Sequence, residues 1–258
     1  MTDSNDSPKL PARVGKSAGT GKKSKALDRI RAATPARPLA DGLRRADLLT
    51  AAIAPQQRPR LVFAFDATAS REPAWDTARE VTDALFTALP GQLDVALAIH
   101  GGGRVHTFTG FSSDARLFRD QAATVHCQAG GTALVNLMEQ VRTHAGIKVL
   151  LYIGDCFEEA PAAAFEQADA LRLRGVRAIL FHDASTGDQK ARDVFEEIAR
   201  RTGGACLDFY GARTNDLRDI LEAVAVLAYG GVKLLEKKKG QLPGARRLLP
   251  FVAQEMNI

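Results

Sequence analysis

The sequence predicts an α/β fold: a three-layer α/β/α sandwich around a mostly parallel six-stranded sheet with one antiparallel edge strand. Three observations lead to this prediction. Short apolar runs alternate with segments of helical periodicity between residues 60 and 230. The runs are continuously apolar, as in strands that are covered on both faces. Only one connection is too short for a parallel crossover.

The first four elements follow from periodicity and glycine placement. Residues 61–65 form a continuous apolar strand, and residues 73–89 carry apolar side chains at helical spacing. Residues 93–99 and 104–108 read as two further strands. Three glycines, 101–103, separate these two strands. We therefore expect a hairpin, because a crossover needs a dozen residues or more.

The rest of the body repeats the strand–helix pattern. The pair of glycines at 203–204 is a usual stop after a helix. Strands are expected at 149–153, 176–181 and 205–209, and helices at 112–124, 132–144, 161–174, 188–201 and 215–229.

Charge divides the chain into segments. Residues 1–60 hold 13 Lys and Arg against 5 Asp, residues 61–230 hold 16 against 23 acidic residues, and residues 231–258 hold 6 against 2. We expect a disordered basic arm at 1–38, an amphipathic helix and linker at 39–59, the body at 60–230, and a flexible basic tail at 231–258.

Composition excludes several protein classes. Hydrophobic residues make up 45% and charged residues 25%, which are ordinary values for a globular chain. No run approaches the roughly 18 apolar residues of a membrane span, and the N-terminal residues carry no secretory signal. Three cysteines are too few for a disulfide framework. We expect a cytoplasmic protein that does not enter a membrane.

Oxygen-bearing side chains gather at the predicted ends of the first and fourth strands. Asp66, Thr68 and Ser70 follow the first strand, and Asp155 follows the fourth. Thr132 begins a helix between them. We expect these side chains to converge, since parallel folds place ligands beyond the carboxyl ends of their strands. Hard oxygen donors without His or Cys suit Mg²⁺, and Mn²⁺ or Ca²⁺ is also compatible.

This pattern resembles the von Willebrand factor type A (VWA) domain family. The family's metal ion-dependent adhesion site is written D-x-S-x-S, then Thr, then Asp. Asp66, Thr68 and Ser70 match the first part, with Thr in place of the usual Ser, and Thr132 and Asp155 match the others. The resemblance covers residues 60–230.

The resemblance implies a binding function rather than catalysis. The hydroxyls of Thr68, Ser70 and Thr132 would ligate the metal, and Asp66 and Asp155 would hold it directly or through water. The metal would then capture a carboxylate of a protein partner. Intracellular bacterial proteins of this kind are often adaptors beside AAA+ ATPases or chaperones.

Other residues lie near these positions in the sequence. Arg71, Glu158 and Glu159 are candidates for a rim that contacts the partner, although flanking roles at helix and loop starts are the more common use of such residues. Cys127 and Cys156 also fall close to the predicted ligands. Buried inert thiols are the commoner case for such cysteines.

Two other functions are alternatives. The basic arm and tail would suit a nucleic-acid-associated protein, whose affinity would fall steeply with salt. A Mg²⁺-dependent phosphatase or hydrolase is less well supported. Thr68 stands where haloacid-dehalogenase phosphotransferases carry a second Asp, and Ser70 lacks the flanking glycines of a nucleophile elbow.

Overall fold

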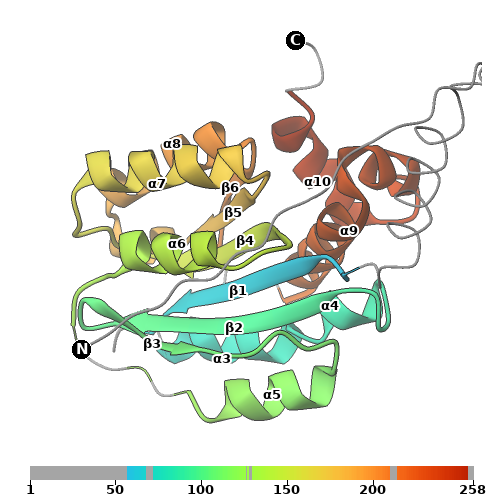
Figure 1. The fold of residues 1–258 in the computed structure, drawn as a ribbon, viewed down its shortest axis with the longest axis horizontal. Coiled ribbons are helices and arrows are strands. Elements are labelled where there is room, and N and C mark those ends of the chain that lie inside the picture. Colours follow the sequence, from blue (N-terminus) through green and yellow to red (C-terminus); the bar gives the residue numbers. More distant parts are fainter. Residues whose placement is uncertain (1–56, 68–71, 126, 128–129, 210–213, 255–258) are drawn as a thin grey trace, which may run out of the picture. The chain divides into compact units, whose positions relative to one another are not determined.

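A computed structural model of the chain describes residues 57–67, 72–125, 127, 130–209 and 214–254 (Figure 1). The predicted arm at 1–38 and nearly all of the predicted helix and linker at 39–59 lie outside these residues. Those two predictions therefore have no structural counterpart here.

Six strands form one sheet in the order β3-β2-β1-β4-β5-β6. All neighbouring strands are parallel except β2 and β3, which form the expected antiparallel hairpin. The strands are β1 (Arg60–Asp66), β2 (Asp94–Gly101), β3 (Arg104–Phe108), β4 (Ile147–Gly154), β5 (Arg177–His182) and β6 (Ala205–Asp208). The predicted fold class is confirmed.

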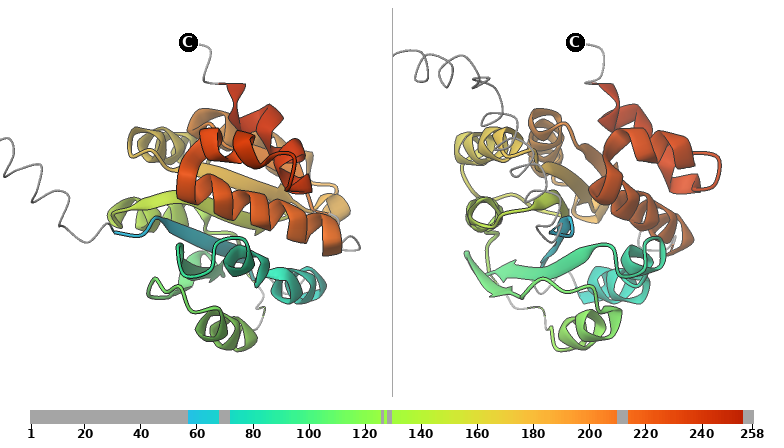
Figure 2. Two further views of the ribbon diagram at one scale, coloured as in Figure 1. Left: turned by 90° about the vertical axis from the view of Figure 1, so that its right-hand side faces the viewer. Right: turned by 45° about the vertical axis from the view of Figure 1, so that its right-hand side comes forward.

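Helices cover both faces of this sheet (Figures 1 and 2). One face packs against α3 (Glu72–Val81), α4 (Ala84–Thr87), α5 (Ala115–Ala123), α9 (Thr214–Lys238) and α10 (Pro243–Val252). The other packs against α6 (Leu134–Thr143), α7 (Pro161–Leu173) and α8 (Gln189–Thr202). A short 3₁₀ turn, η2 (Ala184–Thr186), follows β5. None of the helices that the structure describes has the length and apolarity needed to cross a bilayer.

Alternation along β1 explains why its apolar run is unbroken. Leu61, Phe63 and Phe65 point into the core beneath α3 and α9, whereas Val62 and Ala64 point into the core beneath α6 and α7. All five are fully buried. A strand with two covered faces needs apolar residues at every position.

The predicted helix at 73–89 is two helices in the structure, α3 and α4. Thr82 is fully buried at the break. Its hydroxyl donates to the Arg79 carbonyl at 3.0 Å, and its backbone N–H approaches the same oxygen. A buried threonine hydroxyl needs an acceptor, and using the carbonyl three residues back diverts that group from the regular helical pattern.

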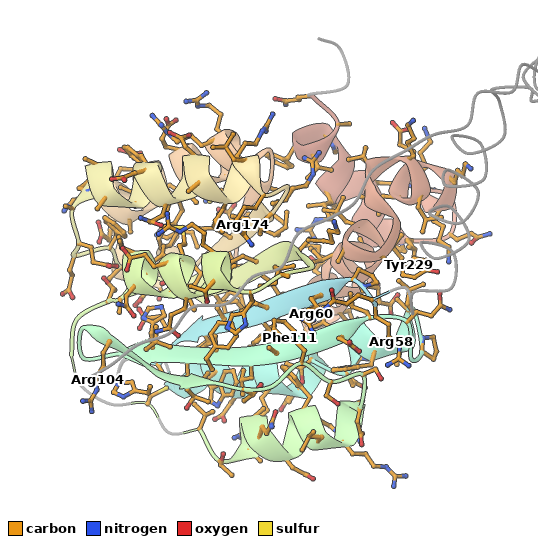
Figure 3. All side chains as sticks on the ribbon, in the orientation of Figure 1. Arg58, Arg60, Arg104, Phe111, Arg174 and Tyr229 are labelled. Carbon is orange, nitrogen blue, oxygen red and sulfur yellow. The ribbon has the colours of Figure 1, made fainter. Side chains whose placement is uncertain are left out.

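An arginine at the start of β1 joins the loop after β3 to the loop before β4. The Arg60 guanidinium lies 4.6 Å from the centre of the Phe111 ring and donates to the Ala145 carbonyl at 3.0 Å (Figure 3). Phe111 and Phe108 both contact the His144 ring. The amino end of β1 is therefore held by side chains as well as by its ladder.

The prediction of a flexible tail at 231–258 is wrong for residues 231–238 and 243–252, which are helical. Gly231 has a φ of 66°, which interrupts the helical geometry where a stop was expected, but the helix resumes and reaches Lys238. Apolar side chains from this segment are buried in the core: Val232, Leu235, Ala245, Leu248 and Val252. The charged residues that suggested a tail are the outer face of packed helices.

We predict that a methyl group at residue 244 disrupts the packing of α10 on α9. A Cβ on Gly244 would lie 2.0 Å from the Asp219 carbonyl oxygen. Gly244→Ala should lower the free energy of unfolding by about 1–3 kcal/mol in urea titrations. Gly240→Ala is the matched control, because a Cβ there meets nothing within 4 Å. Equal stability of the two variants would contradict the packed arrangement.

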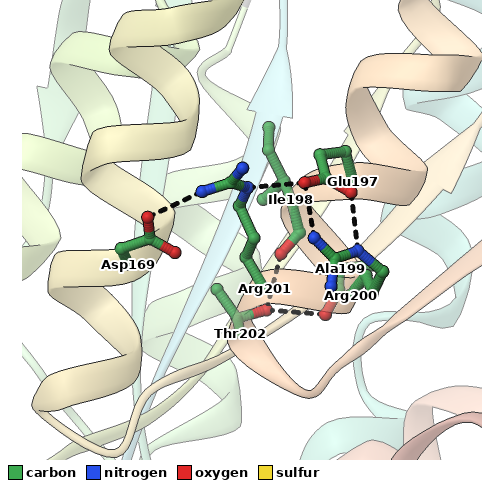
Figure 4. Close-up of polar contacts among 7 residues, drawn as sticks. All are labelled: Asp169, Glu197, Ile198, Ala199, Arg200, Arg201 and Thr202. Carbon is green, nitrogen blue, oxygen red and sulfur yellow. Dashed lines mark hydrogen bonds and ion pairs between the residues drawn. The ribbon is translucent and has the colours of Figure 1, made fainter.

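An ion-pair network joins α8 to α7 (Figure 4). Glu197 accepts hydrogen bonds from Arg200 at 2.7 Å and from Arg201 at 2.6 Å. Arg201 also donates to Asp169 on α7 at 2.7 Å. Hydrogen bonds from Arg200, and then from Arg201, lower the pKa of Glu197 to about 2.

The lowered pKa of Glu197 predicts a loss of stability in acid. A carboxyl whose folded pKa is depressed stabilises the fold above its unfolded pKa, and this contribution is lost as the pH falls. The window runs from about 4.5 down to about 2. Urea midpoints should fall over this window in the wild type by an amount worth up to about 1 kcal/mol, given the exposure of the network. Glu197→Gln should lack that part of the fall, and identical pH profiles would disprove the assignment.

Candidate functional site

The two aspartates of the predicted site follow neighbouring strands. β1 and β4 pair in parallel, with Phe65 opposite Ile153. Asp66 ends β1, and Asp155 comes directly after β4. Their exposed fractions are 0% and 2%. The structure therefore brings both carboxyl groups to one edge of the sheet, as the sequence predicts.

Thr132 reaches the same edge through contacts with the segment after β4. Its hydroxyl accepts a hydrogen bond from the Glu158 backbone N–H at 3.1 Å. Its own N–H donates to Glu158 Oε2, also at 3.1 Å. This reciprocal pair fixes Thr132, which is 5% exposed, beside the loop that carries Asp155. The remaining predicted residues, Thr68, Ser70 and Arg71, lie outside the described residues.

Glu159 caps the helix that begins after Thr132. The residue before α6 is Ala133, which offers no capping side chain. Glu159 supplies the acceptors instead: Leu134 N–H donates to Oε2 at 2.6 Å and Val135 N–H to Oε1 at 2.9 Å. Burial raises the pKa of this carboxyl, and the hydrogen bonds from the two N–H groups oppose that rise. A carboxylate at this position also matches the positive end of the helix dipole.

Glu158 and Glu159, which were predicted to form a partner-contact rim, thus make hydrogen bonds within the chain. Both carboxyl groups engage backbone N–H groups at the entry to α6. Contact of either residue, or of Arg71, with a partner stays a prediction. The signal for the internal use is in the sequence: Gly131 leaves room for Glu158, whose Oε2 would lie 2.6 Å from a Cβ at that position.

Glycines also bring the β2–β3 hairpin against the loop before α6. Gly130 has a φ of 150°, and a Cβ there would lie 2.3 Å from Gly102 Cα. The Gly103 N–H donates to the Gly131 carbonyl at 2.9 Å. Two glycine-rich loops far apart in sequence therefore meet backbone to backbone, which explains glycine at both places.

His100 is the residue that sequence reasoning undervalued. It lies at the end of β2, opposite Asp66 in the ladder, and is fully buried. Its Nδ1 accepts a hydrogen bond from the Ala133 N–H at 3.1 Å and lies 4.0 Å from Asp66 Oδ1. Its ring stacks on Tyr152.

Burial, followed by the charge of the neighbouring His106, lowers the pKa of His100 to about 3. The imidazole is therefore neutral near pH 7 and brings no positive charge to Asp66. His100 links β2 to the start of α6 and so positions Thr132.

These residues fit a hard divalent cation. Two carboxyl groups are almost fully buried at adjacent strand ends, and burying two like charges together is costly unless a cation or a proton offsets them. The donors are oxygens, which Mg²⁺ prefers. Within the described part of the chain, no group of three or more His, Cys, Asp or Glu side chains has the geometry of a metal site. A site here therefore depends on hydroxyl ligands, and two of the predicted hydroxyls fall in the 68–71 gap.

The cysteines near this edge are free thiols. Cys127 and Cys156 are partly exposed, and Cys206 on β6 is buried. Burial raises the pKa of Cys206 to about 12, so this thiol is protonated and unreactive at neutral pH.

Comparison with known proteins identifies the fold. Neither the protein-family models nor the curated proteins contain a match to this chain. Among solved structures, a von Willebrand factor type A protein from Catenulispora acidiphila is 17% identical with a TM-score of 0.56, over 66% of this chain and 43% of that one. Proximal thread matrix protein 1 from the mussel byssus is 16% identical with a TM-score of 0.50, over 65% and 46%. The chain spans less than half the length of both.

We predict that removing the Glu159 carboxylate destabilises the entry to α6. Glu159→Ala leaves the N–H groups of Leu134 and Val135 without their acceptor, and should cost about 1–2 kcal/mol in the free energy of unfolding. Glu166→Ala, at an exposed position on α7, is the control and should change stability by less than about 0.5 kcal/mol. Urea denaturation measures the stability of both variants. A Glu159→Ala variant as stable as the wild type would show that the cap is unimportant.

Proposed function

The chain has the fold of a von Willebrand factor type A domain, and from this premise we propose that it is a metal-dependent protein-binding module without catalytic activity. Asp66, Thr68, Ser70, Thr132 and Asp155 would hold the metal, and a protein partner would supply an acidic residue. The observation that carries the proposal is the burial of Asp66 and Asp155 at the ends of adjacent strands, with Thr132 fixed beside them.

The division of labour among these side chains follows from their charges. Asp66 and Asp155 supply the negative charge that attracts a cation, and the hydroxyls are neutral donors. A bound Mg²⁺ would offer an electrophilic coordination position that a partner's carboxylate can fill. The other polar groups at this site act by positioning. Glu158 holds Thr132, and His100 and Glu159 hold the backbone that follows it.

Hydrogen bonding orients the Thr132 hydroxyl for this role. The hydroxyl accepts a hydrogen bond from the Glu158 N–H at 3.1 Å. A hydroxyl has one proton and two lone pairs. With one lone pair given to the Glu158 N–H, the second lone pair remains for a metal.

The nucleic-acid alternative has less support. The arm on which it depends lies outside the described residues, and the C-terminal basic segment is packed into α9 and α10. AAA+ ATPases and chaperones as partners, like a cytoplasmic location, stay predictions from the family resemblance.

We predict a single divalent-cation site that depends on Asp66. Isothermal titration with Mg²⁺ and Mn²⁺ should show one site in the wild type. Asp66→Asn, which keeps the side-chain shape and removes the charge, should weaken binding at least about tenfold, and Thr132→Ala should also weaken it. Asp94→Asn, on the opposite end of the sheet, should bind as the wild type does.

Partner capture provides the second arm of this test. Proteins retained from a lysate by the wild type in Mg²⁺ should be lost in EDTA and should not be retained by Asp66→Asn. Equal metal binding by wild type and Asp66→Asn would refute the site. Retention that is insensitive to EDTA but abolished by salt would favour the basic surfaces instead.

A further inference from the structure

A small pocket opens beside the strand end that carries Asp66. It has a volume of about 260 Å³ and is lined by residues of β3 and α5. Ala67, the residue after Asp66, belongs to the lining, and Ile99 and Val125 contribute its buried apolar part. Because consecutive Cα atoms are about 3.8 Å apart, the pocket begins one residue away from the candidate metal site.

The end of β2 connects this pocket to the strand end. A Cβ at Gly101 would lie 3.4 Å from the Ala67 carbonyl oxygen and 3.8 Å from His106 Nε2. Both atoms therefore approach the same point. A group bound to His106 is close to the chain segment that follows Asp66.

Arg104 determines where the His106 ring carries its proton. Arg104 begins β3 at the tip of the hairpin (Figure 3), and its Nε donates to His106 Nδ1 at 3.3 Å. A guanidinium has no acceptor, so Nδ1 must be the acceptor in this contact. The ring N–H is then at Nε2, the nitrogen that lies near the Gly101 position. His106, which lines the pocket, is therefore a hydrogen-bond donor at Nε2.

Polar groups on β3 and α5 add further donors and acceptors to the lining. The Thr124 hydroxyl donates to the Gln121 carbonyl at 2.8 Å, so its lone pairs remain as acceptors. In the part of the chain that the structure describes, no hydrogen bond engages the Thr107 hydroxyl or the Gln121 carboxamide. An occupant of the pocket can therefore both donate and accept.

Size and lining restrict the occupant. Pockets for small molecules typically measure about 300–1,000 Å³, so this one suits a single side chain. Its described lining contains no Asp, Glu, Lys or Arg, and a charged group would lose water there without gaining an ion pair. An apolar group would leave the polar atoms of Thr107 and Gln121 without partners. A carboxamide has an acceptor oxygen and two N–H donors, and so matches both kinds of group.

We propose that this pocket binds the side chain of an Asn or Gln that lies within three residues of the partner's acidic residue. This assignment rests on the proposed function, because one partner segment would place its carboxylate at the metal and its carboxamide in the pocket. Three extended residues span about 10 Å, which is enough to reach from one to the other. A metal ion binds any accessible carboxylate, so the carboxamide is what selects among acidic segments.

Peptide selection tests this preference on the full-length protein. Phage-displayed peptides with a fixed central Asp and random flanking residues are selected against the wild type in Mg²⁺. We expect Asn or Gln to be enriched within three residues of the Asp. The strongest binder is then synthesised, and replacing its Asn or Gln by Leu should weaken binding about tenfold, because the polar lining is left unpaired.

Matched variants locate the carboxamide. Thr107→Val and Gln121→Leu keep the approximate size of each side chain and remove its polar atoms. Each should weaken binding of the selected peptide about threefold to tenfold, and the Leu analogue should bind these variants no more weakly than it binds the wild type. Gln92→Leu, at an exposed position before the amino end of β2, is the control and should bind as the wild type does.

Isothermal titration with Mg²⁺ separates this assignment from the proposed function. Both pocket variants should bind Mg²⁺ as the wild type does, since neither residue is a predicted metal ligand. With Mg²⁺ binding intact, three results would overturn the pocket assignment alone: no enriched peptide, enriched peptides without Asn or Gln, or equal affinity of the wild type and the pocket variants for the selected peptide. Absence of Mg²⁺ binding to the wild type would overturn the proposed function and this assignment together.

Discussion

The parallel pairing of β1 with β4 is the constraint on which the candidate site depends. Asp66 and Asp155 are separated along the chain by α3, α4, the β2–β3 hairpin, α5, α6 and β4, and only this pairing makes their strand ends adjacent. The pairing in turn needs both faces of β1 to be covered. The two carboxyl groups at these strand ends are themselves almost fully buried. The pairing that completes the centre of the sheet therefore also assembles the candidate site.

Burying the two carboxyl groups carries a desolvation cost that depends on the charges around them. His100, the nearest histidine to Asp66, is held neutral by its own burial. The carboxylates of the two glutamates after Asp155 accept hydrogen bonds from backbone N–H groups at the start of α6. His100, Glu158 and Glu159 thus position Thr132, and none of the three carries a positive charge near neutral pH. Such an arrangement suits an ion that arrives from solvent.

Local sequence was sufficient for much of this fold and insufficient where distant segments meet. Leu61–Phe65 predicts a buried strand because every position must be apolar, and Gly101–Gly103 predicts a hairpin because of its length. The break between α3 and α4 depends on a tertiary feature, because the buried Thr82 hydroxyl must donate to the Arg79 carbonyl. The helices after Gly231 were hidden by their charge, since Lys237 and Arg246 mark the outer face and the buried Leu235 and Leu248 the inner one.

The site shows the same division. The positions of Asp66 and Asp155 follow from strand ends and topology, so the sequence predicts them. The partners of Glu158 and Glu159 are about 25 residues away along the chain. Gly131 leaves room for one of these contacts but does not identify the partner, because the N–H groups at the start of α6 become donors at fixed positions only after the helix has formed. The sequence shows that residues 102 and 130 are both glycine, but it does not show that their backbones are in contact.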